Sequence, residues 1–377
     1  MKKVLTTHVG SLPRPEILLK LMQARDDGEA VDESRLANEL RTAVADVVAK
    51  QVEIGVDIVS DGEMSKPGYV SYVNERLEGF GSSWEGHIAQ DLRDYRNLAI
   101  HLVKTGLVIP TGGGPCCIGP VAVRDTTALE ADLANFAAAL GKSGHKDAFM
   151  NSASPGVVAV FQKNEYYPSE DAYIEAVAEA LRSEYEAIVT AGFALQLDSP
   201  DLAMGRHLAC ADMSDDEFLV VVRRNVAALN EATRNIPSDR LRMHVCWGNY
   251  PGPHHHDIPL TKILPAVLEA RPRYLLLEGA NPRHAHEYDL FGAIELPEDK
   301  VLVPGVIDST SNYIEHPDLV AQRICNYADI VGRDRVMAGS DCGFSTFRGL
   351  PTVYPDITWE KLKSLVEGAK RATERLY

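Results

Sequence analysis

The stretch LRMHVCWGN, residues 241–249, is a short apolar run that ends in polar residues. Runs of the same kind recur, as in YLLLEGA at 274–280, and amphipathic segments lie between them. This alternation predicts parallel strands joined by helices, and therefore an α/β fold. The eight predicted strands are Val4–Leu12, Asp57–Glu63, Ala148–Ala153, Ala194–Asp198, Arg242–Trp247, Tyr274–Ala280, Val301–Ile307 and Val336–Cys342.

Eight strands are the number that closes a TIM (β/α)8 barrel. The alternative is a doubly wound open sheet, which has the same alternating pattern. The first predicted strand is not followed by GxGxxG, and TGGG at 111–114 follows no clear strand–helix–strand pattern, so the barrel is favoured. Two connecting helices are indicated by apolar residues on one face before a glycine: Leu36, Leu40, Val44, Val48 and Val52 before Gly55, and Ile174, Val177, Leu181, Tyr185 and Ile188 before Gly192.

We expect one catalytic domain over residues 1–377, because this length is within the range of a single barrel with insertions. The segment at about 64–146 is too long for an ordinary connection. It contains the turn-rich run TGGGPCCIGP at 111–120 and a predicted helix near 127–140. We therefore predict an inserted excursion after the second strand, with a β-hairpin and a helix.

The chain has 38 basic and 54 acidic residues, a net charge of -16. Such a charge repels phosphate backbones and anionic membranes, so we expect neither a nucleic acid nor a membrane as partner. The first residues, MKKVLTTHVGSLPRP, have too short an apolar run for a signal peptide, and no stretch is apolar enough to span a membrane. We expect a cytoplasmic protein, and the sequence leaves its oligomeric state open.

Four metal-ligating side chains lie at the ends of predicted strands: His244, Cys246, Glu278 and Cys342. The C-terminal ends of barrel strands converge on one mouth, and His244 and Cys246 project from the same side of their strand. An imidazole, two thiolates and a carboxylate suit Zn(II) better than Mg(II) or Ca(II). Each residue alone also fits a structural role, since buried cysteines are common in cores. The carboxylate after the apolar run YLLL still requires a partner.

These residues lie in segments that resemble the catalytic barrel of the cobalamin-independent methionine synthase family. The resemblance extends over essentially the whole chain, and it implies a TIM barrel with zinc held by His244, Cys246, Glu278 and Cys342. This chain lacks the extra N-terminal half of full-length methionine synthases, so it resembles the single-barrel branch, which includes epoxyalkane:coenzyme M transferases. The segments are HVGSLPRP at 8–15, SDGE at 60–63, LQLDSPDLA at 195–203, HVCWGN, LLLEGANPRHAHEYD, VPGVIDSTSNYIEHP and MAGSDCGF.

The same resemblance implies that homocysteine is the thiol substrate and that it binds near Ser11, Glu63 and Asp198. Two carboxylates at one mouth can hold an α-ammonium group, and Ser11 can offer its N–H and hydroxyl to the α-carboxylate. The alternative is that Glu63 and Asp198 cap the helices that follow them.

We expect a zinc-dependent S-methyltransferase that acts on a small thiol with a methyl or alkyl donor. Coordination to zinc deprotonates a thiol, and Glu278 is the expected ligand to loosen as the substrate sulfur arrives. One alternative is the addition of coenzyme M to an epoxide, which would require a cationic sulfonate pocket. Another is a non-catalytic zinc-binding or thiol-binding barrel.

Two departures from the family pattern leave the donor and the proton source open. The family's proton-donating histidine corresponds to Thr310, and a threonine is a poor general acid. The aromatic residue expected near a folate ring is missing from SPGVVAVFQ, where Phe161 is only adjacent. Either His284 or His286 could supply the acid or contact the substrate. For the run His254–His256 we expect a solvated loop near the substrate and no second metal site, because consecutive side chains of an extended loop point in different directions.

Overall fold

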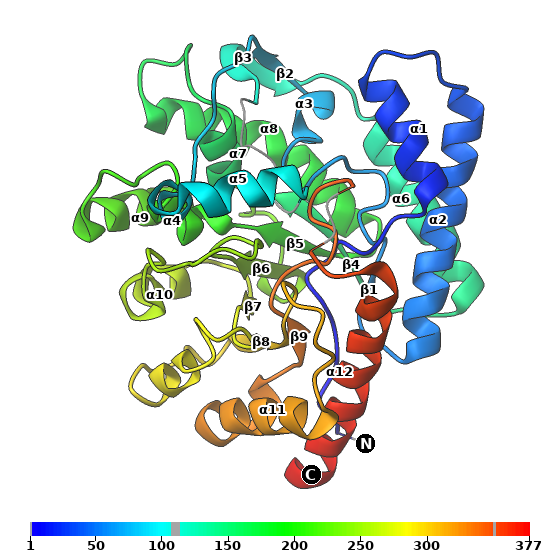
Figure 1. The fold of residues 1–377 in the computed structure, drawn as a ribbon, viewed down its shortest axis with the longest axis vertical. Helices are drawn as coiled ribbons and strands as arrows, with labels where there is room; N and C mark the ends of the chain where they lie inside the picture. The colour runs from blue at the N-terminus through cyan, green and yellow to red at the C-terminus, as the bar shows by residue number, and fades with distance from the viewer. Residues whose placement is uncertain (1, 107–113, 350–351) are drawn as a thin grey trace.

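A computed structural model describes residues 2–106, 114–349 and 352–377. Its centre is a curled parallel sheet of seven strands, in which every strand pairs with the next one along the sheet order (Figure 1). The strand order follows the chain without reversal, whereas a doubly wound sheet reverses its order, so the open-sheet alternative is wrong. The strands are β1 (Val59–Ser60), β4 (Ala148–Ala153), β5 (Ala194–Asp198), β6 (Leu241–Val245), β7 (Tyr274–Leu277), β8 (Val301–Ile307) and β9 (Gly339–Ser340).

The predicted first strand, Val4–Leu12, is an extended segment with a single bridge. Thr6 pairs in parallel with Ala338, next to β9, and the Ile58 N–H beside β1 donates to the Thr6 carbonyl at 3.0 Å. The segment is thus hydrogen-bonded to both edges of the sheet, and Figure 1 shows it in dark blue alongside β9.

The strands match the prediction in the middle of the sheet and differ at its edges. β4, β5 and β8 have the predicted bounds, whereas β1 and β9 keep two residues each of the predicted 57–63 and 336–342. The reason is that residues after these strands leave the ladder and turn their side chains into the mouth of the sheet, as the buried Asp61, Glu63 and Asp341 do.

Helices surround the sheet on its outer face (Figure 1). The predicted helix before Gly55 is α2, which ends where Gly55 takes φ 96°, and the one before Gly192 is α8. No helix in the described ranges is both long and apolar enough to cross a membrane. The long helices are α1 (Glu16–Asp26), α2 (Glu33–Ile54), α6 (Thr127–Ser143), α7 (Pro155–Phe161), α8 (Glu170–Thr190), α9 (Asp215–Ala232), α10 (Leu260–Leu268), α11 (Pro317–Val331) and α12 (Pro355–Leu376). Single 3-10 turns are η1 (Pro200–Leu202), η2 (Met204–Arg206), η3 (Ser238–Arg240), η4 (Glu287–Gly292) and η5 (Arg333–Arg335).

The segment between β1 and β4 contains a small antiparallel ribbon. β2 (Leu77–Gly81) pairs with β3 (Cys116–Val123), and α6 follows. The predicted turn at 111–120 is different: residues 111–113 lie outside the described residues, and residues from Cys116 onward form β3 itself. Three short helices complete the segment: α3 (Val73–Arg76), α4 (Gln90–Asp94) and α5 (Arg96–Lys104).

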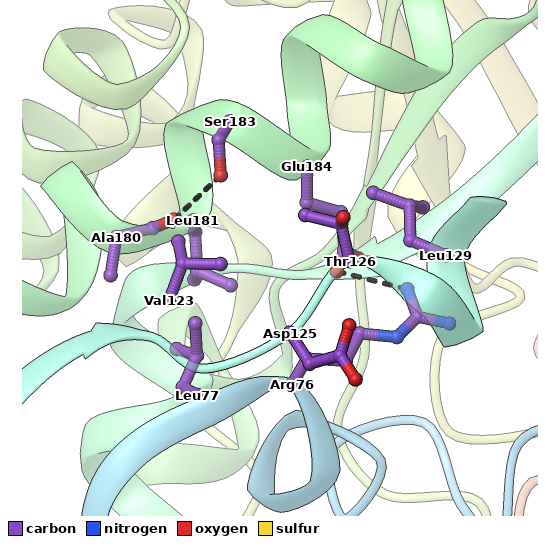
Figure 2. Close-up of a pocket in the computed structure, with 10 residues that line it drawn as sticks. All are labelled: Arg76, Leu77, Val123, Asp125, Thr126, Leu129, Ala180, Leu181, Ser183 and Glu184. Atoms are coloured by element: carbon purple, nitrogen blue, oxygen red, sulfur yellow. Dashed lines mark hydrogen bonds and ion pairs between the residues drawn. The ribbon is translucent and has the colours of Figure 1, made fainter.

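Arg76, at the end of α3, fastens this segment to the helices around it. Its guanidinium is buried and lies 2.6 Å from the carboxylate of Asp132 in α6 and 2.9 Å from that of Glu184 in α8. Burial would raise the pKa of Glu184, but the charges of Arg76 and Lys66 lower it overall. Figure 2 shows Arg76 and Glu184 beside a cavity of about 10 Å³, which has room for about one water and none for a substrate.

Replacing Arg76 with methionine should destabilise the fold by about 3–5 kcal/mol, because two buried carboxylates would lose their shared cation. Urea unfolding followed by circular dichroism measures the change. The matched control is Arg25→Met, since Arg25 meets Glu75 in an exposed pair worth about 0–1 kcal/mol. Equal stability of the two variants would show that Arg76 is not the anchor described here.

Candidate metal centre

The four predicted ligands are buried and lie at the ends of three strands of the sheet, β6, β7 and β9. His244 is in β6, and Cys246 is the first residue after that strand. Glu278 comes immediately after β7, and Cys342 comes two residues after β9. Because the strands are parallel, these positions share one edge of the sheet.

Three of the four bring their ligand atoms together. The ring nitrogens or sulfurs of His244, Cys246 and Cys342 lie within 4.8 Å of one another. The two sulfurs are 3.8 Å apart, far more than the roughly 2.05 Å of a disulfide. Two thiolates on a tetrahedral zinc ion, each with a Zn–S bond of about 2.3 Å, are separated by about the same 3.8 Å. The observed sulfur separation therefore fits zinc.

The protonation of these groups also fits a cation. Burial lowers the pKa of His244 to about 3, so its imidazole is neutral. Neither ring nitrogen has a hydrogen-bond partner in the described part of the chain. The adjacent Cys342 thiol and burial raise the pKa of Cys246 well above its usual value. Without a cation two adjacent buried thiolates would repel each other, and the imidazole lone pair would have no partner.

Glu278 lies beside this cluster without belonging to it. Its Oε1 accepts the Trp247 N–H at 2.8 Å, and its Oε2 accepts the Asn281 side-chain amide at 2.7 Å. Burial and the neighbouring Cys246 raise its pKa well above the usual value. The carboxylate is thus next to a cysteine of the cluster but is satisfied by protein donors.

Asp341 is a site residue that the sequence analysis did not single out. It is buried next to Cys342, and its carboxylate accepts the N–H groups of Gly279, Ala280 and Asn281 at 2.8 Å each. Burial and the nearby Asp308 raise its pKa to about 6. The sequence carries a signal for Asp341, because it is a carboxylate at the end of a buried strand, as Glu278 is.

Glu63 and Asp198 form a second buried group at the same mouth. Asp198 accepts hydrogen bonds from the side-chain amides of Asn151 and Gln196, whereas Glu63 Oε2 has no partner among the described residues. Burial raises the pKa of Glu63 to about 8, and the charge of Asp198 adds to this shift. Burial also raises the pKa of Asp198, to about 6. Lys66 partly opposes both shifts. Arg14 also opposes the shift of Glu63 and Arg242 that of Asp198, yet burial keeps both pKa values raised.

Neither carboxylate caps a helix, so the capping alternative is wrong. The next helical turns begin from Tyr72 and from Ser199. Glu63 instead has φ 56°, a left-handed conformation that costs a residue other than glycine about 1 kcal/mol or more. Such strain in a buried acidic residue is typical of a binding site.

Ser11 is joined to the loop that carries Cys342. Its hydroxyl accepts the Ser345 N–H at 3.3 Å. It also lies so close to Gly343 that a Cβ at that glycine would be 2.0 Å from Ser11 Oγ. Ser11 is therefore held near the cysteine cluster, and among the described residues no hydrogen bond joins it to Glu63 or Asp198.

A cavity of about 280 Å³ opens beside Glu278. Its walls are residues 248–254 after β6, the turn after β7 and residues 308–310 after β8. The Thr310 hydroxyl donates to Asp308 at 2.8 Å, so it is committed to a neighbour. This cavity is large enough for a small co-substrate.

Of the two candidate histidines, His284 is buried at this cavity and His286 is exposed. The His284 ring packs against Trp247 and bonds to Glu287 at 2.8 Å and to Asp257 at 3.2 Å. Burial would lower its pKa, but the two carboxylates raise it to about 10. His284 is therefore a fixed cation whose two N–H groups both have partners.

Tyr69 is an aromatic residue of the site that the sequence analysis missed. Its ring packs edge-on against Phe161, with centroids 5.9 Å apart, and against Phe347. Burial, and then the charges of Cys246 and Cys342, raise the pKa of its hydroxyl well above the usual value. It comes from the long segment after β1, where no pattern in the sequence pointed to the site.

Cys246→Ser or Cys342→Ser should each lower bound zinc from about one ion per chain to nearly none, because a tetrahedral thiolate site does not tolerate the loss of a sulfur. Elemental analysis of the purified proteins gives the ratio. Cys325→Ser, at a half-buried cysteine outside the cluster, is the control that should keep its metal. Full zinc occupancy in either cluster variant would count against this ligand set.

Comparisons with known proteins agree with one another. The family described as cobalamin-independent synthase, catalytic domain, matches residues 4–97. A methionine synthase from Saccharolobus solfataricus is 26% identical over 98% of this chain and 95% of its own. A 5-methyltetrahydropteroyltriglutamate–homocysteine methyltransferase from Ralstonia pickettii is 24% identical over 98% of this chain, which corresponds to 42% of that protein.

The structure of a B12-independent methionine synthase from Shewanella sp. W3-18-1 in complex with selenomethionine superposes with a TM-score of 0.74. It shares 19% identity and covers 100% of this chain and 99% of its own. A putative vitamin-B12 independent methionine synthase from Listeria monocytogenes gives a TM-score of 0.67 at 20% identity, with 98% and 99% covered. At these identities the likeness establishes the fold.

Proposed function

We propose that this chain, which is similar to proteins of the cobalamin-independent methionine synthase family, is a member of that family. We propose that it is a zinc-dependent methyltransferase acting on the sulfur of homocysteine or a related small thiol. The observation that carries the proposal is the pair of buried sulfurs, 3.8 Å apart, beside the unpartnered imidazole of His244. The relatives named above as methionine synthase and homocysteine methyltransferase support this choice of reaction.

We further propose that the scaffold is a closed (β/α)8 barrel in one domain. In this reading the segment around Thr6 is the remaining strand, since it is hydrogen-bonded to both edges of the seven-stranded sheet. The segment at about 64–146 is then an excursion after the second strand, and it brings Tyr69 to the mouth.

His244, Cys246 and Cys342 are the proposed protein ligands, with Glu278 as the fourth. A zinc ion held there would supply Lewis acidity that lowers the pKa of a substrate thiol. Of the four ligands, Glu278 would be the most weakly held, because Trp247 and Asn281 already donate hydrogen bonds to its two oxygens.

Glu63 and Asp198 are the proposed site for the α-ammonium group of the thiol substrate. The unpartnered Oε2 of Glu63, and the burial that raises the pKa of both carboxyls, favour a cation with hydrogen-bond donors. Ser11 is proposed for the α-carboxylate. Carboxylates in this place disfavour the alternative substrate coenzyme M, whose sulfonate would be repelled by them.

The cavity beside Glu278 is the proposed site for the methyl donor. Thr310 donates its hydroxyl to Asp308, so the chain offers no general acid at that position. This favours a donor whose leaving group needs little help from a proton, or one protonated from elsewhere. The donor class is therefore to be decided by assay among methyl-folate, methylcobalamin and a short epoxide.

When each thiol is offered with each of these three donors in turn, we expect homocysteine, and not coenzyme M, to be alkylated by at least one of them. Asp198→Asn should keep the zinc and raise the KM for homocysteine about 10- to 100-fold, since a hydrogen bond to a charged group contributes about 1.5–3 kcal/mol. Mass spectrometry of the product and elemental analysis of the variant measure both effects.

Three results would contradict this proposal. Turnover of coenzyme M with the epoxide alone would favour the epoxide-opening alternative. No turnover with any pair, together with tight thiol binding, would favour a non-catalytic thiol-binding barrel. Loss of zinc in Asp198→Asn would remove the distinction between the metal centre and the ammonium site.

Binding of methionine, the expected product, should release protons. Glu63 has a pKa of about 8 in the free protein, so at pH 7 it is mostly protonated. A bound ammonium favours the carboxylate, so its proton leaves; the release should be nearly one proton at pH 7 and should shrink as the pH rises past 8. Methionine has no thiol, so thiol ionisation does not contribute.

Calorimetry in buffers of different ionisation enthalpy counts these protons. Glu63→Gln should abolish the release, whereas the control Glu75→Gln, at an exposed glutamate, should leave it unchanged. Undiminished proton release from Glu63→Gln would mean that another group is the one that titrates.

A further inference from the structure

Asp94, His255 and His256 converge at the surface, and the two histidines directly follow His254, which lines the cavity. Asp94 ends α4, and the two histidines belong to the loop after β6. The Nε2 atoms of His255 and His256 lie 2.9 and 2.6 Å from the same oxygen of Asp94, and their ring centroids are 4.2 Å apart. The ligand atoms of all three lie within 4.8 Å of one another.

This arrangement differs from the expectation for the His254–His256 run. His254 does turn away, toward Asp257 at 3.2 Å and the Tyr250 carbonyl. The next two side chains instead point at one carboxylate that is 161 and 162 residues away in the chain. The reason is that His254 has φ 53°, a left-handed turn that breaks the extended alternation.

We propose that Asp94, His255 and His256 form a second site for a divalent transition metal ion such as Zn²⁺, separate from the cysteine cluster. Two imidazole nitrogens and one carboxylate oxygen are a borderline donor set that such ions prefer to Mg²⁺ or Ca²⁺. The three side chains are 47%, 38% and 31% exposed, so water completes the coordination. Lacking thiolates, this site binds more weakly than the cysteine cluster.

A metal ion is a better partner for this group than the hydrogen bonds alone. A single carboxylate oxygen that accepts from two imidazoles satisfies both rings but leaves each bond open to competition from water. One cation between the three groups attracts all of them at once. It requires only that each exposed ring carry its proton on Nδ1, which leaves the Nε2 lone pairs free.

The site would act on the cavity through the loop that it holds. The same short helix already grips that loop through Asp91, which accepts the Tyr250 hydroxyl at 2.7 Å and the His254 N–H at 3.0 Å. Tyr250 and His254 line the cavity beside Glu278. A metal ion bound to Asp94, about one turn after Asp91, would join α4 to the loop at a second point. The loop that forms the cavity wall would then be held at both Asp91 and Asp94.

The proposal does not depend on the methyl-transfer reaction, and metal binding alone tests it. The full-length protein is first dialysed against a mild chelator, so that only the cysteine cluster keeps its zinc, and is then titrated with Zn²⁺ in a calorimeter. We expect one further equivalent per chain. In His256→Ala and in Asp94→Asn its affinity should fall by more than the roughly tenfold that the loss of an outer-shell partner costs.

Two controls separate this site from the rest of the chain. His316→Ala, at another exposed histidine beside an aspartate, should keep the second equivalent. Cys246→Ser should lose the first equivalent and keep the second. The proposal is overturned if the wild-type protein takes up no second equivalent, or if His256→Ala and Asp94→Asn, both folded by circular dichroism, titrate like the wild type.

Discussion

The proposed chemistry of this protein depends on two buried thiols that lie beside a neutral imidazole. The neighbouring Cys342 thiol and burial raise the pKa of Cys246, and burial lowers that of His244. The sulfurs lie on an apolar layer that includes Val9 and Leu276 inside the sheet, so water cannot screen them. A bound cation would stabilise this arrangement, because it favours the deprotonated form of both thiols and accepts the lone pair of the imidazole.

The sequence predicted the fold well where strands are buried on both faces. There the apolar runs are unambiguous, and β4, β5 and β8 have the predicted bounds. It predicted less well at strand ends, because residues such as Glu63 and Cys342 continue an extended pattern in sequence but leave the ladder in space. Local sequence does not encode whether a residue at the end of a strand stays paired, since the neighbouring strand decides that.

The grouping of His244, Cys246 and Cys342 was predictable from the strand topology. His244, Cys246 and Cys342 are attached directly to strands, so the topology alone brings them to one edge. Tyr69 and Asp94 belong to the long segment after β1, and the spacing of residues in that segment gave no indication of their contacts. The pairing of Asp94 with His255 and His256 was missed because an extended loop was assumed, whereas the positive φ of His254 redirects the chain.

Glu278 connects these parts of the site. One of its oxygens is held by Trp247, the residue after Cys246, and the other by Asn281, which Asp341 holds next to Cys342. The carboxylate is therefore positioned by the neighbours of both cysteines, and it also lines the cavity of about 280 Å³. A shift of either cysteine loop would change the hydrogen bonds of Glu278, so the geometry of the proposed metal ligands is coupled to the wall of that cavity.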